Sequence, residues 1–151
     1  MIKKVMSLLI VLSIVMSISS VAPITVFAIT ATNGNCGENL TWTFDEETNT
    51  LSISGTGEMW DWSPGSWAPW DSIGAKFNVV INHGVTNISN YAFYSKSLTS
   101  ITIPDSVIAI GDYAFSFCGN EFTSIVIPNS VKSIGDYAFS NNDLETIVLG
   151  S

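Results

Sequence analysis

The side chains that could support covalent catalysis in this chain are two thiols, Cys36 and Cys118, and one imidazole, His83. A thiol nucleophile needs a base within hydrogen-bond reach and a third group that orients this base. Cys118 occupies a position that Lys96 and Asn142 hold in two similar segments, where a small buried side chain is expected. His83 lies in a different part of its segment, so we expect the two groups to be far apart and the chain not to be an enzyme.

The sequence also has few residues that could bind a metal ion or a cofactor. One His and two Cys are too few for a structural zinc site, and the acids lack the spacing of a calcium loop. The sequence has no Gly-rich phosphate loop and no Gly-x-Ser-x-Gly elbow. We expect no cofactor and no metal. Cys36 and Cys118 fall in separate parts of the chain, so we expect two free thiols.

Aromatic side chains are the stronger candidates for recognition. All five Trp lie between residues 42 and 70. Exposed rings could stack on sugars or anchor a protein partner, whereas rings that fold inward would seal the start of the fold. Both interpretations stay open, and the candidate side chains are Trp60, Trp62, Trp67 and Trp70.

The first 28 residues resemble a secretory signal peptide. Lys3 and Lys4 precede an apolar run from Val5 to Val21, and Val26-Phe27-Ala28 suits cleavage after Ala28. An uncleaved membrane anchor is the alternative, because the run is long enough to span a bilayer. We expect a secreted or cell-surface protein that meets the membrane only transiently.

The charge of the remaining chain excludes a class of partner. Removing residues 1–28 leaves three Lys against thirteen acids, a net charge of −10. Such a surface is repelled by phosphate, so the chain is not expected to bind nucleic acid.

The second half of the chain is repetitive. Similar segments begin at Val85, Val107 and Val131, which are 22 and 24 residues apart. This period lies within the range of leucine-rich repeats. We expect a partial repeat at 77–84 and full repeats at 85–106, 107–130 and 131–151, with extra residues near 117–121 that make the second turn bulge.

Each repeat has two apolar halves. Alternating β-branched residues predict strand rungs at 79–81, 101–103, 125–127 and 147–149. Spacings of three and four, as in Ile110, Tyr113 and Ala114, predict short helical turns, with Asp112 placed to cap one. The expected fold is a β-rich α/β solenoid of leucine-rich repeats, with parallel strands on one face and helical turns on the other.

Strand periodicity also predicts which side chains face solvent. If Ile101 and Ile103 point inward, their neighbours point outward and form ladders of polar and β-branched groups. A flat surface of this kind suits a broad protein contact, although it is also what exposed parallel strands tolerate. The candidate binding residues are Asn78, Val80, Ser100, Thr102, Ser124, Val126, Thr146 and Val148.

Residues 29–76 differ from the repeats. Alternation at 40–44 and again at 51–54, with turn residues between, predicts a β-hairpin. We expect this segment, which includes a Trp-rich loop, to cap the first rung of the solenoid. If nothing follows it in the chain, the rung at 147–149 is a candidate edge for self-association.

These motifs resemble a known family. The run Cys36–Trp42, the run Leu51–Gly57 and the strings Ile110–Phe115 and Ile125–Pro128 are similar to the cap and repeats of BspA-type leucine-rich repeat proteins of bacteria. The resemblance implies adhesion or contact at a cell surface without catalysis. We therefore expect a non-catalytic recognition module for an extracellular protein or glycan. The alternative is a structural spacer or the N-terminal fragment of a longer multi-repeat surface protein.

Overall fold

The computed structural model describes residues 32–150, so the predicted signal peptide at 1–28 lies outside the described residues. Within this range the chain forms strands and no helix, and no described segment is a helix that could cross a membrane. The strands are β1 (Asn33–Asn35), β2 (Leu40–Asp45), β3 (Thr50–Gly55), β4 (Gly57–Glu58), β5 (Phe77–Ile81), β6 (Val85–Ile88), β7 (Leu98–Thr102), β8 (Ala109–Ile110), β9 (Ser124–Ile127), β10 (Ser133–Ile134) and β11 (Thr146–Leu149).

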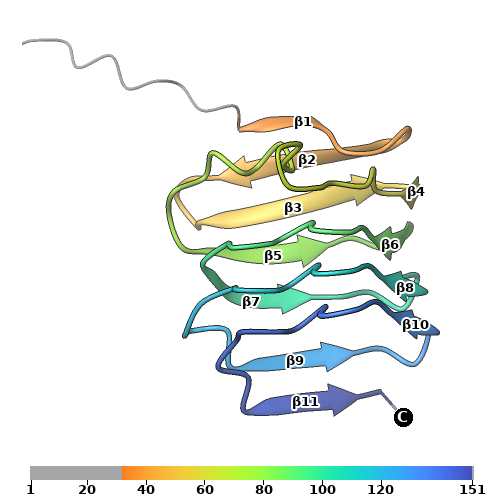
Figure 1. Ribbon diagram of the computed structural model, residues 1–151. Coiled ribbons are helices and arrows are strands. Elements are labelled where there is room, and N and C mark those ends of the chain that lie inside the picture. Colours follow the sequence, from red (N-terminus) through yellow and green to blue (C-terminus); the bar gives the residue numbers. More distant parts are fainter. Residues whose placement is uncertain (1–31, 151) are drawn as a thin grey trace, which may run out of the picture.

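The strands stack as successive coils of one solenoid. The longer strands β3, β5, β7, β9 and β11 follow one another down one side, and the short strands β4, β6, β8 and β10 form a second column at a corner (Figure 1). The second column is a continuous parallel ladder in the order β10-β8-β6-β4. The remaining side of each coil is a turn segment that follows the corner strand. The predicted parallel rungs overlap β5, β7, β9 and β11.

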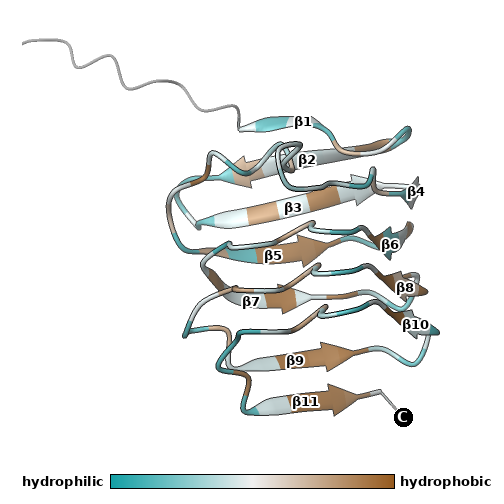
Figure 2. Ribbon diagram, in the orientation of Figure 1, coloured by the Kyte–Doolittle hydropathy of each residue, from teal (hydrophilic) through white to brown (hydrophobic). Residues whose placement is uncertain are grey.

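Alternation of side chains explains why the rungs are strands. In β5 the side chains of Phe77, Val79 and Ile81 are buried while Asn78 and Val80 are half-buried. β9 shows the same period of two, with Ile125 and Ile127 buried and Ser124 and Val126 exposed. One face of β5 and of β9 therefore packs in the interior and the other face is turned toward solvent. Apolar stretches lie in the later parts of β5, β7, β9 and β11, whereas β1 is hydrophilic (Figure 2).

The predicted helical turns are wrong. Tyr91, Tyr113 and Tyr137 have φ values of 55°, 54° and 56°, which a right-handed helix cannot include. Alternate backbone N–H groups of the turns donate to the next coil, for example from Phe93 to Ala114 O at 2.8 Å and from Phe115 to Ala138 O at 2.8 Å. The N–H groups between them bond within the turn, as from Tyr94 to Tyr91 O at 3.2 Å. Pairing between coils therefore takes the place of the continuous i to i−4 bonds of a helix.

The aspartate predicted to cap a helix has a different role. The Asp112 side chain accepts a hydrogen bond from the backbone N–H of Asp136 in the following coil, at 2.8 Å. Its own N–H donates to the Asn90 side chain at 2.7 Å, and the N–H of Asn90 donates to Asp61 at 3.2 Å. These side chains form an Asx ladder along the solenoid, consisting of Asp61, Asn90, Asp112 and Asp136.

The predicted β-hairpin is confirmed. β2 and β3 pair antiparallel from Leu40↔Gly55 to Asp45↔Thr50. In the connecting turn, Asp45 Oδ1 accepts the N–H groups of Glu47 and Thr48, and these bonds lower the pKa of the Asp45 carboxyl. β3 also pairs in parallel with β5, so the hairpin covers the first rung by extending its sheet. The boundary at residue 76 stays a prediction.

The row of rungs is interrupted once. The sheet β1-β2-β3-β5-β7 ends at β7, and β9 pairs only with β11 among the described strands. The interruption coincides with the predicted bulge in the second full repeat, where Gly119 has a φ of 89°. The corner column of short strands continues past this point, so the coils remain stacked.

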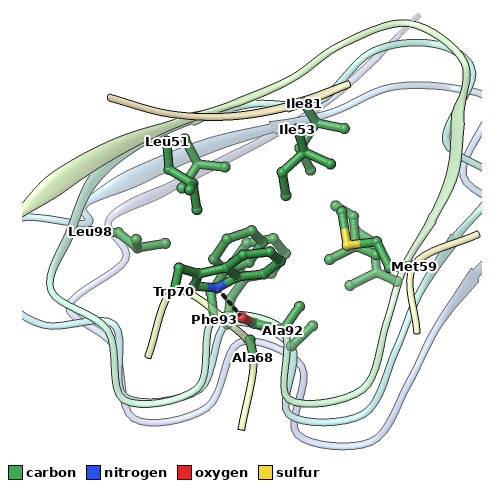
Figure 3. Close-up of a cluster of buried hydrophobic side chains, with 14 of the residues drawn as sticks. Leu51, Ile53, Met59, Ala68, Trp70, Ile81, Ala92, Phe93 and Leu98 are labelled. Carbon is green, nitrogen blue, oxygen red and sulfur yellow. Dashed lines mark hydrogen bonds between the residues drawn. The ribbon is translucent and has the colours of Figure 1, made fainter. Parts of the chain in front are cut away.

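The interior is built on a stack of aromatic rings. Trp70, Phe93, Phe115 and Phe139 follow one another with centroid separations of 5.5, 5.3 and 5.4 Å and interplanar angles of at most 20°. Aliphatic side chains of the rungs face this stack, and Trp70 Nε1 donates to Ala92 O at 2.8 Å (Figure 3). Each coil thus buries one aromatic ring against the next, which gives the repeats a shared core.

Candidate functional site

The first candidate surface is the outward side of the rungs, which we call the strand face. It consists of the side chains that sequence periodicity assigned to it, and their exposure increases along the solenoid. Asn78 and Val80 are half-buried, whereas Ser100, Thr102 and all the later members are exposed. The complete set is Asn78, Val80, Ser100, Thr102, Ser124, Val126, Thr146 and Val148.

Hydrogen bonds fix part of the strand face. Asn78 Oδ1 accepts the hydroxyl groups of Thr99 at 2.5 Å and Ser100 at 2.9 Å, which holds two coils in register. No ionisable group belongs to the strand face, so it offers hydroxyl, amide and methyl groups without a net charge. Because β7 and β9 do not pair, the surface is divided into a part on β5 and β7 and a part on β9 and β11.

The cap enlarges the first part of this surface, which the sequence analysis did not predict. Ser52 pairs with Val80, and Thr43 pairs with Ser52, so three strands continue the same face. Thr41 and Thr43 are exposed and Ser54 is half-buried. The signal was present in the alternation of hydroxyl residues in both hairpin strands. The alternation alone does not show that β3 pairs in parallel with β5, and this pairing is what joins the hairpin to the strand face.

The structure separates the four candidate tryptophans into two kinds. Trp70 is completely buried and Trp62 half-buried, whereas Trp60 and Trp67 are 48% and 40% exposed. Trp62 packs edge-on against both Trp60 and Trp70, at 6.4 and 6.1 Å. Packing against the core therefore accounts for two of the rings, and two remain available to a partner.

A second surface was missed by the sequence analysis. Tyr91, Tyr113 and Tyr137 stack along the turn side with centroid separations of 5.0 and 5.1 Å. Trp67 stacks on Tyr94 at 5.8 Å, and Phe117 meets Tyr94 edge-on at 5.7 Å. We call these six residues the turn-face aromatics. The recurrence of Tyr before Ala-Phe in every repeat is the signal of this surface in the sequence, although the same spacing also fits the packing of a helical turn.

A shallow recess of about 200 Å³ lies at the cap end of the turn-face aromatics. Its lining combines two aromatic rings, a hydroxyl and an ion pair. The ion pair joins Lys96 Nζ to Asp71 Oδ1 at 2.5 Å, and Lys96 also donates to the Asp71 backbone carbonyl at 3.1 Å. The lining residues are Trp67, Asp71, Tyr94, Ser95 and Lys96.

The thiols and the imidazole are not brought together. Cys118 is fully buried and its Sγ donates to Phe93 O at 3.2 Å, while burial raises its pKa to about 12. Burial likewise raises the pKa of the Cys36 thiol to about 12, and both cysteines are free. His83 is exposed beside Asp105, its counterpart in the next coil, with Nε2 3.5 Å from Oδ1. Neither thiol has the activated form that a nucleophile requires.

The described residues contain no group of three or more His, Cys, Asp and Glu side chains that could hold a metal ion. Acidic side chains instead have structural or surface roles, as Asp112 does in the Asx ladder and Glu121 does in its ion pair with Lys76.

Stacked parallel rungs with repeats of 22 and 24 residues define a leucine-rich repeat protein. Residues 77–151 match a family described as "BspA type Leucine rich repeat region (6 copies)", so the repeat region of this chain belongs to the BspA-type leucine-rich repeat family. Leucine-rich repeats are generally non-catalytic, and proteins of this type are typically secreted or found at the bacterial surface.

Two solved structures are similar to this chain. A leucine-rich repeat protein from Eubacterium ventriosum aligns with a TM-score of 0.58 and 24% identity, over 76% of this chain and 39% of that chain. A leucine-rich repeat protein from Bacteroides capillosus aligns with a TM-score of 0.40 and 20% identity, over 80% of this chain and 100% of that one. The first likeness shows the fold alone, and this chain spans well under half of that protein. A comparison with curated proteins gave no match.

Proposed function

We propose that this chain is a non-catalytic recognition module, secreted or held at a bacterial surface, that binds an extracellular protein or glycan. The observation that carries the proposal is the strand face, a row of hydroxyl, amide and β-branched side chains on successive rungs, exposed from β7 onward. A preorganised surface loses little conformational entropy when a partner binds. The exposed Trp60 and Trp67 of the cap would add aromatic contacts of the kind that dominate interface energies.

The chemistry of the strand face favours a broad partner. The surface is flat and uncharged, and it lacks the converging polar groups that orient a small molecule. A partner can form hydrogen bonds with its hydroxyl groups and apolar contacts with side chains such as Val126, which is 57% exposed. Few rungs give a modest area, so we expect weak binding that repetition or multivalency would strengthen.

A direct test is binding of the full chain to immobilised matrix protein, mucin and bacterial cells, measured by biolayer interferometry. The double variant Thr102→Lys and Val126→Lys keeps the inward residues but puts two charges on the strand face. We expect at least one surface to bind the wild type and the double variant to bind it about tenfold more weakly or worse.

The matched control is His83→Ala, which removes an exposed side chain outside the strand face. It is expected to bind as the wild type does. Absence of binding to all three surfaces would contradict the proposal and favour the structural spacer. Equal binding by the wild type and the double variant would show that the strand face is not the recognition surface.

A further inference from the structure

The recess beside Trp67 has the composition of a small binding site. Trp67 is 40% exposed although it stacks on Tyr94 with an interplanar angle of 11°. Asp71 and Lys96 place a carboxylate and an ammonium group beside these rings, and Ser95 adds a hydroxyl. One aromatic surface is therefore combined with hydrogen-bond acceptors and donors within about 200 Å³.

The residues of this recess are held in place from two sides. Trp70, three residues after Trp67, is fully buried and donates to Ala92 O at 2.8 Å, which ties the cap loop to the first full coil. The N–H of Asp71 donates to Ala68 O at 2.8 Å. Lys96 contacts two oxygens of Asp71, and its side chain is only 13% exposed. The ring and the charged groups are thus ordered before a ligand arrives, which reduces the entropic cost of binding.

The stacking geometry restricts the shape of the ligand. The ring centroids of Trp67 and Tyr94 are 5.8 Å apart. A flat group inserted between two rings needs about 3.5 Å of contact distance on each side, so it does not fit there. A proline ring therefore cannot be inserted between Trp67 and Tyr94. A ligand can only lie on the outer side of this pair of rings.

Electrostatics restrict the charge of the ligand. Asp71 and Lys96 neutralise each other, so the recess attracts neither a cation nor an anion through a free charge. The chain without residues 1–28 carries a net charge of −10, which repels acidic polysaccharides. A neutral molecule is favoured. It needs one apolar face to contact the indole, and hydroxyl groups to form hydrogen bonds with the carboxylate and the ammonium group. A neutral hexose or pentose unit has this combination, because its axial C–H bonds form the apolar face.

We propose that the recess formed by Trp67, Asp71, Tyr94, Ser95 and Lys96 binds a sugar unit of a neutral glycan. The sugar ring lies over the exposed part of Trp67, while its hydroxyl groups donate to the Asp71 carboxylate and accept from Lys96. This inference rests on the proposed recognition function and assigns a ligand class to the turn side of the cap, apart from the strand face.

The test uses the full chain and four defined probes, the neutral hexasaccharides cellohexaose, xylohexaose, mannohexaose and chitohexaose. Binding is followed through the indole N–H signals of the tryptophans in ¹H–¹⁵N spectra, with each probe raised to about 10 mM, since single-sugar sites are weak. We expect at least one probe to shift the Trp67 signal. Because the Trp67 variants lack this signal, all variants are compared by isothermal titration calorimetry. Trp67→Ala should abolish binding, Trp67→Tyr should retain part of it, and Asp71→Asn should weaken it about tenfold.

Two controls make the result decisive. His83→Ala and the strand-face variant Thr102→Lys with Val126→Lys should bind the sugar as the wild type does, so failure of this site is distinguishable from failure of the strand face. The proposal is overturned if no probe shifts the Trp67 signal or if Trp67→Ala binds as well as the wild type. It is equally overturned if decaproline or heparin perturbs Trp67 while the four hexasaccharides do not.

Discussion

The side-chain oxygen of Asn90 accepts a hydrogen bond from the backbone N–H of Asp112, which lies in the next coil, at 2.7 Å. The same bond recurs between Asp112 and Asp136 at 2.8 Å. Each side chain therefore satisfies a backbone donor of the following coil and sets the register between the two. The Asx ladder continues into the cap, where Asp61 accepts from Asn90, so cap and repeats share one stacking device.

The Asx ladder predicts that two substitutions at residue 112 lower the free energy of unfolding by different amounts. Asp112→Ala removes the acceptor for the Asp136 N–H and should lower the free energy of unfolding by about 1 kcal/mol. Asp112→Asn keeps an oxygen acceptor at the same place and should stay within about 0.5 kcal/mol of the wild type. Urea denaturation followed by circular dichroism measures both. Equal losses for the two variants would show that the side-chain acceptor does not stabilise the stack.

Gly111 is predicted to be intolerant of any side chain. A Cβ atom at this position would lie 2.5 Å from both the backbone nitrogen and the side-chain oxygen of Asn90. Gly111→Ala should therefore lower the free energy of unfolding by about 2 kcal/mol or more, because the ladder must shift to admit a methyl group. The matched control is Gly74→Ala, since a Cβ there meets nothing within 4 Å. Comparable melting temperatures for the two variants would contradict the tight approach of the coils.

Two phenylalanines close together in the sequence should differ sharply. Phe115 is fully buried in the aromatic stack, whereas Phe117 is 49% exposed on the turn side. Phe115→Ala should lower the free energy of unfolding by about 3–5 kcal/mol, because it leaves a cavity between Phe93 and Phe139. Phe117→Ala should cost less than about 1.5 kcal/mol. Chemical denaturation of both variants checks this order, and a reversed order would place the core on the other side of the turn.

The two thiols predict a dependence of stability on alkaline pH. Burial raises the pKa of Cys36 and of Cys118 from 9.0 to about 12 in the folded chain. The unfolded chain then loses these protons first, so the stabilising contribution is complete below pH 9 and is lost as the pH rises toward 12. Stability measured by urea denaturation should fall across this window, and less so in the variant Cys36→Ala with Cys118→Ala.

Reactivity gives an independent check on the same thiols. At pH 8 the native chain should react with a thiol reagent at well below the rate of the chain unfolded in urea, which should expose two thiols. Rapid labelling of either cysteine in the native chain would contradict its buried position.

A fragment of the protein that stops at residue 151 should self-associate weakly through the edge of β11 that does not pair with β9. Ile147 and Leu149 of β11 are 51% and 70% exposed, although their counterparts Ile125 and Ile127 in β9 are buried. An open strand edge with apolar side chains is a template for pairing with another chain. Sedimentation velocity should show a concentration-dependent increase in mass that Val148→Pro and Leu149→Lys together remove. A strictly monomeric wild type at high concentration would refute the prediction.

Much of the fold could be predicted from the sequence because its apolar pattern repeats. Alternating β-branched residues placed the rungs, and turn residues at 45–49 placed the hairpin, since both signals are local. The turn segments could not be predicted in the same way. The spacing of Ile110, Tyr113 and Ala114 fits a helix as well as it fits a coil whose N–H groups bond to the next repeat, and only the positive φ of Tyr113 separates the two.

The candidate surfaces were predictable to different degrees. The strand face follows from a period of two, so its members were assigned from the sequence. The recess joins Trp67 and Asp71 of the cap to Tyr94 and Lys96 of the first full repeat. This contact depends on how the cap loop packs on the coil, and no periodic signal links the two segments.

The stacking of the coils is the central claim, because both candidate surfaces exist only if successive repeats lie on one another. The most direct measurement is the set of nuclear Overhauser effects between the ring protons of Phe93, Phe115 and Phe139 in the labelled chain. Centroid separations of 5.3 and 5.4 Å predict strong cross-peaks between successive rings, which lie 22 and 24 residues apart in the sequence. Absence of these cross-peaks, with contacts confined to each repeat, would contradict the shared core and remove both proposed binding surfaces.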